Sequence, residues 1–209
     1  KFKILKRVKN FLKIITEYDK YVGYIKNKKF INKFKPTHKV KVLKTRINKT
    51  NTYLPFSTEI EIKKRKKNYV MFEKGKWIKE KDITFLNKKE KNFIKVFKLF
   101  LNSKYKWGGK THQGIDCSAL VQLFYKFNNK FFPRDTIDQI KTKKGTINKI
   151  SFRKGYIIFW KGHVAICIDA KKLIHAYGPE KKVIIMSIKK TIRRIEITAN
   201  LKVKKIFKI

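Results

Sequence analysis

The sequence predicts an α+β protein in which small β-barrels precede a domain that packs a cysteine-bearing helix on an antiparallel sheet. Residues 1–86 hold many short β-prone runs separated by polar turns, a pattern typical of small barrels. Apolar residues after Cys117 keep the i, i+3, i+4, i+7 spacing of a helix with one buried face. Residues 156–197 hold further β-prone runs joined by short turns.

Length and composition allow one large or two to three small packed domains. The chain has 209 residues, of which 42% are hydrophobic and 14% aromatic. No apolar run approaches the ~18 residues that a membrane-spanning helix needs. The chain opens at Lys1 without a methionine or a signal-like apolar core, so we interpret it as a mature or truncated form, and its start does not reveal the compartment.

The strongly basic composition first suggests a nucleic-acid or anionic-surface partner. Lysine and arginine number 56 against 14 acidic residues, which gives a formal charge of +42. However, the lysines are spread through every segment, as AT-rich codon usage would produce, and no zinc-finger spacing, RNA-recognition signature or arginine cluster is present. We therefore expect no specific nucleic-acid partner, and weak association with anionic polymers as a side effect.

The N-terminal half divides into two small β modules at Pro36-Thr37. Residues 1–35 form the first, which looks incomplete, and residues 36–86 form the second, in which His38 is interpreted as an ordinary surface residue. The expected strands of both modules are Phe2–Leu5, Asn10–Ile15, Tyr21–Ile25, Val40–Leu43, Thr58–Ile62, Tyr69–Phe72 and Trp77–Ile78.

The lysine-rich stretch Asn87–Lys91 marks the start of a third domain, residues 87–209. A helix is expected from Phe93 to Leu101, followed by a glycine-rich loop and the Cys117 helix. Asp135 or Thr136 then caps a short helix that follows a proline. The expected strands of the sheet are Tyr156–Trp160, His163–Ile168, Leu173–Tyr177, Val183–Ile188 and Ile192–Ile197.

Cys117 is the candidate nucleophile because it lies in the first turn of its helix. Backbone N–H groups and the helix dipole favour an anion there, so we expect the thiol pKa to fall from ~8.5 into a range of about 3.5–7.5. A lone cysteine is more often a buried hydrophobe. Here Asp116 precedes it, Ser118 follows it, and histidines occur downstream, a combination that favours a cysteine–histidine site.

His163 and His175 lie in consecutive expected strands. They share a face if the intervening turn gives an even register, which the sequence leaves open. If the Cys117 helix packs on that face, the thiol meets His163 and His175 orients the imidazole. His112, in the loop before Cys117, is a rival base that we interpret as a loop residue.

Metal binding is the competing chemistry for the same residues. Cys117, His163 and His175 could supply three zinc ligands, but no local pair of ligands such as Cys-x-x-Cys is present. We therefore expect neither a metal nor another cofactor. The two cysteines, Cys117 and Cys167, do not make a disulfide framework.

Several motifs follow one another between about residues 93 and 198, namely YKWGG, GIDCSALVQ, FPRDTIDQ, GHVAI and LIHAYG. Their combination resembles the NlpC-type cell-wall endopeptidases, which are papain-like cysteine peptidases of bacteria. Residues 1–86 are similar to the tandem bacterial SH3-like domains that precede this catalytic domain in the subgroup acting on free murein peptides.

The resemblance implies a catalytic triad of Cys117 as nucleophile, His163 as base and His175 as orienting residue. The resemblance also implies that Asp116 recognises the free amine of an N-terminal L-alanine and that a tyrosine of the first SH3-like domain closes the amine pocket. The residues implied to bind substrate are Tyr105, Asp116, Ser118, Asp135, Thr136 and either Tyr21 or Tyr24.

The implied reaction is hydrolysis of the bond between γ-D-glutamate and a diamino acid such as meso-diaminopimelate in murein peptides, by a monomer, during peptidoglycan turnover or recycling. Recycling in the cytoplasm is slightly favoured over a periplasmic or secreted role. Two alternatives stay open. One is a papain-like amidase or acyltransferase on the same scaffold, and the other is a non-catalytic cell-wall binding protein.

Overall fold

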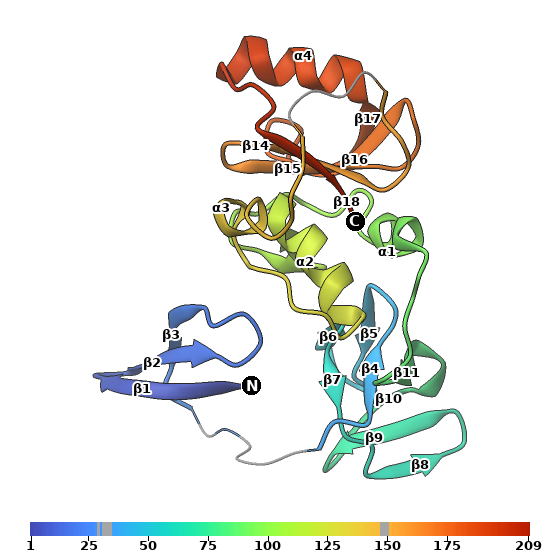
Figure 1. Ribbon diagram of the computed structural model, residues 1–209. Helices are drawn as coiled ribbons and strands as arrows, with labels where there is room; N and C mark the ends of the chain where they lie inside the picture. The colour runs from blue at the N-terminus through green and yellow to red at the C-terminus, as the bar shows by residue number, and fades with distance from the viewer. Residues whose placement is uncertain (29, 31–34, 147–150) are drawn as a thin grey trace.

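The computed structural model describes residues 1–28, 30, 35–146 and 151–209, and Figure 1 shows three parts along the chain. The N-terminal part is a three-stranded antiparallel sheet in the order β1-β2-β3, made of β1 (Phe2–Val8), β2 (Phe11–Thr16) and β3 (Val22–Lys26). Leu12 and Ile14 of β2 lie on the same face of this sheet and are buried. The three strands expected here are confirmed.

The middle part packs three small sheets around one apolar core. The strands are β4 (His38–Val40), β5 (Lys44–Arg46), β6 (Tyr53–Pro55), β7 (Glu59–Ile60), β8 (Lys64–Lys66), β9 (Tyr69–Glu73), β10 (Lys76–Lys79) and β11 (Ile83–Phe85), with a 3₁₀ turn η1 (Glu80–Asp82) before the last. They pair as β11-β4-β7, β5-β6 and β10-β9-β8. The core is formed by Val40, Ile47, Ile60, Val70, Ile78 and Ile83. His38, expected at the surface, is instead buried, with its ring centroid 4.7 Å from that of Phe85.

The C-terminal part contains a five-stranded antiparallel sheet in the order β17-β16-β15-β14-β18. Its strands are β14 (Tyr156–Trp160), β15 (His163–Cys167), β16 (Lys172–Tyr177), β17 (Lys182–Ser187) and β18 (Lys205–Lys208). Before the sheet come α1 (Phe93–Leu99), the short pair β12 (Lys110–Thr111) and β13 (Gly114–Ile115), α2 (Cys117–Phe127) and α3 (Thr136–Gln139). The predicted hairpin is confirmed, because Trp160 pairs with His163 and Gly162 takes a φ of 76°.

Helices cover both faces of this sheet (Figure 1). Alternate residues such as Val164 and Ile166 pack with α1 and α2 in one core. Their neighbours Ala165 and Cys167 pack on the other side with α4 (Ile188–Ala199). The sheet is therefore buried on both sides, which explains why its strands are apolar at successive positions.

One element of the expected sheet is wrong. Residues 192–197 were expected to form a strand but belong to α4, and the strand that completes the sheet is β18, which pairs with β14. The buried positions of α4 are Ile188, Thr191 and Ile195, which follow helical spacing. Ser187 caps the helix by accepting the N–H of Lys190 at 3.5 Å. The isoleucine-rich composition suggests a strand, but the spacing of these residues fits a helix.

Candidate active site

Cys117 begins α2 and its sulfur lies against the start of β15. Asp116 caps the helix, since its Oδ1 accepts the N–H of Ala119 at 2.8 Å. The Cys117 thiol donates to the carbonyl of Gly162, with Sγ and O 4.0 Å apart, and it faces the backbone N–H of Val164. Both partners are chain neighbours of His163, so the thiol and this histidine belong to one site.

The two histidines share a face of the sheet and contact each other. Ile166 pairs with Ile174 and Cys167 with Leu173, an even register that brings His163 and His175 together. His163 Nε2 lies 2.9 Å from His175 Nδ1. The register that the sequence left open is therefore the one that assembles the pair.

The hydrogen-bonding partners of His175 indicate which nitrogen of His163 is free. His175 Nε2 lies 3.3 Å from the sulfur of Met186, which can only accept a hydrogen bond. With its proton on Nε2, neutral His175 accepts at Nδ1, and His163 must then donate from Nε2. The remaining nitrogen of His163, Nδ1, is left unprotonated and able to accept a proton.

The helix does not pack where the sequence analysis expected. We expected the Cys117 helix to pack on the face that carries the histidines, but α2 packs on the opposite face, with Val164 and Ile166. The histidine face packs instead in the core that includes Tyr177 and α4. Cys117 is the first residue of α2 and His163 is the first residue of β15, and the thiol contacts Gly162, the residue before His163, so the two element ends meet.

The expected lowering of the Cys117 pKa is wrong. The residue is only 6% exposed, and burial raises the pKa of the thiol to about 11, although backbone N–H groups of Val164, Ser118 and Cys117 itself act in the opposite direction. Burial also lowers the pKa of His163 to about 4. Thiol and imidazole are therefore both neutral at neutral pH in the resting site.

Asp116 is the centre of a buried polar network. Arg134 binds both carboxylate oxygens, with Nη2 2.6 Å from Oδ2 and Nη1 3.0 Å from Oδ1. Gly108 N–H donates to Oδ2 at 2.8 Å, and the Ser118 hydroxyl donates to Oδ1 at 3.0 Å. With the capping N–H of Ala119, the carboxylate accepts five hydrogen bonds. The family resemblance implies that this carboxylate binds a free amine, and in the structure it is already paired with Arg134.

Arg134 is the residue that the sequence analysis missed. It lies in the quoted FPRDTIDQ motif and is buried, which is uncommon for an arginine without a partner. Besides Asp116, it donates to the hydroxyl of Ser118 at 2.8 Å. An arginine between a proline and an aspartate, following a buried acidic residue in the helix-start motif, is the signal that could have identified the pair.

The other residues that were predicted to bind substrate differ in their surroundings. Burial raises the pKa of Tyr105, and electrostatic interaction with Cys117 and Asp116 raises it further. Asp135 precedes α3, is exposed and acts electrostatically on Arg134. Thr136 is the first residue of α3 and is partly buried.

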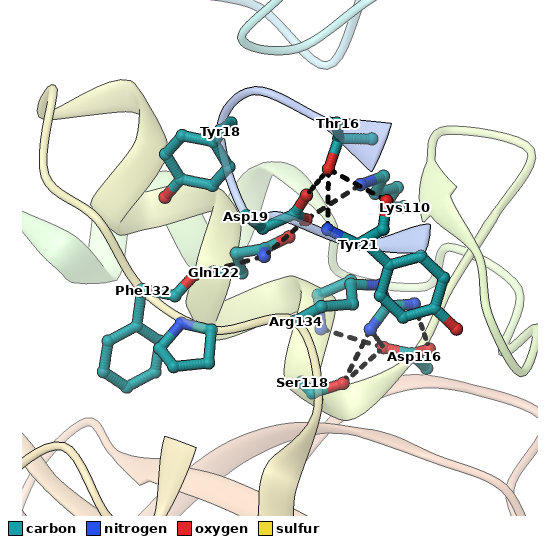
Figure 2. Close-up of polar contacts among 12 residues, drawn as sticks. Thr16, Tyr18, Asp19, Tyr21, Lys110, Asp116, Ser118, Gln122, Phe132 and Arg134 are labelled. Atoms are coloured by element: carbon teal, nitrogen blue, oxygen red, sulfur yellow. Dashed lines mark hydrogen bonds and ion pairs between the residues drawn. The ribbon is translucent and has the colours of Figure 1, made fainter. Parts of the chain in front are cut away.

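The two candidate tyrosines of the N-terminal part differ. In Figure 2, Tyr21 lies next to Arg134 and Asp116. Tyr24 lies on β3 and is largely exposed. His112, the rival base, lies against the middle part, with its ring centroid 5.8 Å from that of Tyr53. The structure thus favours Tyr21 over Tyr24, and His163 over His112.

The described residues also show whether this part of the chain holds a metal site, a disulfide, a membrane-spanning helix or another pocket. Both cysteines are free and buried, and within the described ranges no group of three or more His, Cys, Asp or Glu side chains is placed to hold a metal ion. No helix in the described part of the chain is long and apolar enough to cross a membrane. A groove of about 540 Å³ lies in the middle part and shares no residue with this site; it is lined by Asn68, Tyr69, Lys79, Glu80 and Lys81.

Comparison with known proteins identifies the domain that carries the site. Residues 102–200 match the NlpC/P60 family. The chain is 32% identical over 87 residues to dipeptidyl-peptidase 6 of Lysinibacillus sphaericus, an alignment that covers 41% of this chain and 31% of that protein. It is 30% identical over 155 residues to a γ-D-glutamyl-L-lysine dipeptidyl-peptidase of Bacillus cereus, covering 66% of this chain and 45% of that protein. The chain thus spans less than half the length of these relatives.

The similarity in fold extends beyond residues 102–200 to most of the chain. It resembles the crystal structure of an NlpC/P60 family protein from Bacillus cereus, with a TM-score of 0.76, 22% identity, and coverage of 90% of this chain and 74% of that chain. The resemblance predicted from the motifs is thereby confirmed, and residues 102–200 are a domain of the NlpC/P60 family.

Proposed function

We propose that the protein is a cysteine peptidase that hydrolyses the bond between γ-D-glutamate and a diamino acid in murein peptides with a free N-terminal L-alanine. The observation that supports it most is the contact of His163 Nε2 with His175 Nδ1 at 2.9 Å, which leaves His163 Nδ1 available beside a thiol held between Gly162 and Val164. The similarity to proteins named as peptidases supports a hydrolase.

In this proposal Cys117 and His163 exchange a proton during the attack. The resting pair is neutral, so the Sγ–H proton passes to His163 Nδ1 as sulfur attacks the carbonyl carbon of the scissile amide. His175 holds the imidazole and stabilises the charge that develops on it. His163 then returns the proton to the leaving amine, and water hydrolyses the thioester with His163 again as base.

The start of α2 supplies the groups that stabilise the oxyanion. The backbone N–H groups of Cys117 and Ser118 act on the sulfur in the resting site. These groups belong to the positive end of the helix, where negative charge is favoured. An oxygen that becomes negative next to the sulfur would therefore be stabilised without rearrangement of the backbone.

The proposal also assigns roles to the two N-terminal parts and to the residues around the substrate pocket. We interpret residues 1–35 and 36–86 as SH3-like modules and residues 87–209 as the catalytic domain. Tyr21 would close the amine end of the pocket, while Tyr105, Ser118, Asp135 and Thr136 would line it. Asp116 would accept a further hydrogen bond from the amine, in addition to the hydrogen bonds that it accepts from Arg134 and the backbone.

The substrate is tested by identifying the products. L-Ala-γ-D-Glu-meso-diaminopimelate and its L-lysine counterpart are incubated with the protein, and products are followed by mass spectrometry. We expect L-Ala-γ-D-Glu and the free diamino acid. N-acetylation of the alanine should slow turnover by about tenfold or more, the effect of losing one charged hydrogen bond. Release of free alanine, or equal rates for the acetylated peptide, would contradict the assignment of bond or of amine recognition.

A further inference from the structure

The turn between β2 and β3, residues 17–21, lies against the catalytic domain (Figure 2). The Tyr18 hydroxyl donates to the carbonyl of Lys130 at 2.9 Å. The Tyr18 ring lies 6.1 Å from that of Phe131, and Lys126 Nζ lies 5.7 Å from its centroid. This turn is therefore the place where the N-terminal part docks on the region around α2.

Asp19 makes the central contact of this docking. Its side chain is 1% exposed, and its Oδ2 accepts from Gln122 Nε2 at 3.0 Å and lies 3.6 Å from Lys110 Nζ. Its Oδ1 accepts from the Thr16 hydroxyl. A buried carboxylate is costly unless it is paired. Gln122 and Lys110 belong to the catalytic domain, so docking of the turn adds a cationic partner and an amide donor to the hydrogen bond from Thr16.

The pKa of Asp19 agrees with this geometry. Burial raises the pKa, but the hydrogen bond from Thr16, the charge of Lys110 and the hydrogen bond from Gln122 together lower it below its ordinary value. Asp19 is therefore ionised at neutral pH and binds its partners as a carboxylate.

Thr16 connects Asp19 to Tyr21. The Thr16 hydroxyl donates to Asp19 and accepts the N–H of Tyr21 at 2.9 Å, while the Thr16 N–H donates to the Tyr21 carbonyl at 3.0 Å. The position of Tyr21 over Arg134 and Asp116 in Figure 2 thus depends on the turn that Asp19 holds. Tyr21 itself is 49% exposed, so neighbouring side chains do not fix it by burial.

We propose that Asp19 is a positioning residue that docks the β2–β3 turn on Gln122 and Lys110 and thereby holds Tyr21 as a wall of the substrate pocket. Asp19 does not touch the substrate; it acts through Thr16 and Tyr21. This inference rests on the proposed function, because the pocket is the one assigned there to the N-terminal end of the peptide.

The test compares Asp19→Ala and the milder Asp19→Asn with Glu17→Ala, a control that removes an exposed carboxylate from the same turn. Binding of the dipeptide L-Ala-γ-D-Glu to the full chain is measured by calorimetry, and exchange of the Tyr21 amide hydrogen is followed by mass spectrometry. In the Asp19 variants we expect the dipeptide Kd to rise about tenfold and the exchange to accelerate by a similar factor. Glu17→Ala should match the unmodified protein in both.

Kinetics separate positioning from a general loss of structure. With the tripeptide substrate, KM should rise in the Asp19 variants while kcat and the thermal midpoint of the catalytic domain stay as in Glu17→Ala. Faster exchange with unchanged Kd and KM would show that Asp19 docks the turn without shaping the pocket, and would overturn the inference. If kcat and the thermal midpoint fall together in the Asp19 variants, Asp19 has a structural role, and the inference is overturned.

The outcomes also distinguish this inference from the proposed function. If the dipeptide binds the unmodified protein and the Asp19 variants equally, the inference alone fails. If the dipeptide does not bind the unmodified protein at all, the substrate class is wrong, and the positioning of Tyr21 for that substrate is overturned with it.

Discussion

His163 Nε2 lies 2.9 Å from His175 Nδ1, and this contact leaves Nδ1 as the free nitrogen of His163. Because the thioether of Met186 accepts from the other nitrogen of His175, the three side chains form a directed chain of donors and acceptors that ends at His163 Nδ1. The chain keeps one ring orientation and one tautomer, which is the task of the third member in cysteine and serine triads.

Replacing His175 tests this orientation. In His175→Leu the acceptor for His163 N–H is lost while volume is roughly kept, so we expect kcat to fall about 100-fold or more, within the range for general acid–base groups. His175→Asn retains an oxygen acceptor and should lose clearly less. The measurement is kcat on the tripeptide, with thermal unfolding to check folding. Equal losses in the two variants would contradict an orienting role.

The Asp116–Arg134 pair should be essential for stability. Both side chains are buried, and Arg134→Met leaves Asp116 without its cationic partner, which we expect to cost about 3–5 kcal/mol of unfolding free energy. Urea unfolding measures this loss. Arg65→Met, which breaks an exposed ion pair with Glu80, is the control and should have a much smaller effect. A loss from Arg134→Met no larger than that from the control would contradict the network.

The pH dependence of activity should reflect the buried imidazole. His163 acts as base only when unprotonated, and burial lowers its pKa from 6.5 to about 4. As pH falls from 7, His163 therefore stays unprotonated well below the ordinary histidine range. We expect the acid limb of kcat/KM, measured from about pH 3 to about pH 9 at constant ionic strength, to lie below pH 6.5. A half-maximal value at or above pH 6.5 would contradict this environment.

Lys39 joins the middle part to the end of α2. Its Nζ contacts the carbonyl of Phe127 and lies 4.4 Å from the centroid of that ring, and burial lowers its pKa from 10.5 to about 8. Between these values the unfolded chain binds more protons than the folded one, so this group makes stability rise with pH. The unfolding free energy of the unmodified protein relative to Lys39→Met should thus increase from about pH 8 to about pH 10. The exposed Lys41→Met gives the baseline, and a flat difference for Lys39 would contradict the assignment.

Local signals in the sequence predict much of this fold. Lys161-Gly162 between two apolar runs predicts the β14–β15 hairpin, and the apolar spacing after Cys117 predicts α2. Composition is a poorer guide in α4, where repeated isoleucines suggest a strand but Ile188, Thr191 and Ile195 have helical spacing. Where spacing and composition disagree, the burial pattern follows the spacing.

The sequence predicts which residues form the site, but it does not predict how they contact one another. The register that joins His163 to His175 depends on one residue more or less in a turn, and no local pattern determines it. The pKa of Cys117 depends on burial, which opposes the helix dipole and is not visible in the sequence around a helix start. Arg134 was overlooked because its partner Asp116 is 18 residues earlier in the chain.

The most direct test of the account compares cleavage of L-Ala-γ-D-Glu-diamino acid peptides by the unmodified protein and by Cys117→Ala. The account predicts cleavage at the γ-D-glutamyl bond by the unmodified protein and no cleavage by the variant, which should fold with an unchanged circular dichroism spectrum. Cleavage by Cys117→Ala at the rate of the unmodified protein would contradict a thiol nucleophile.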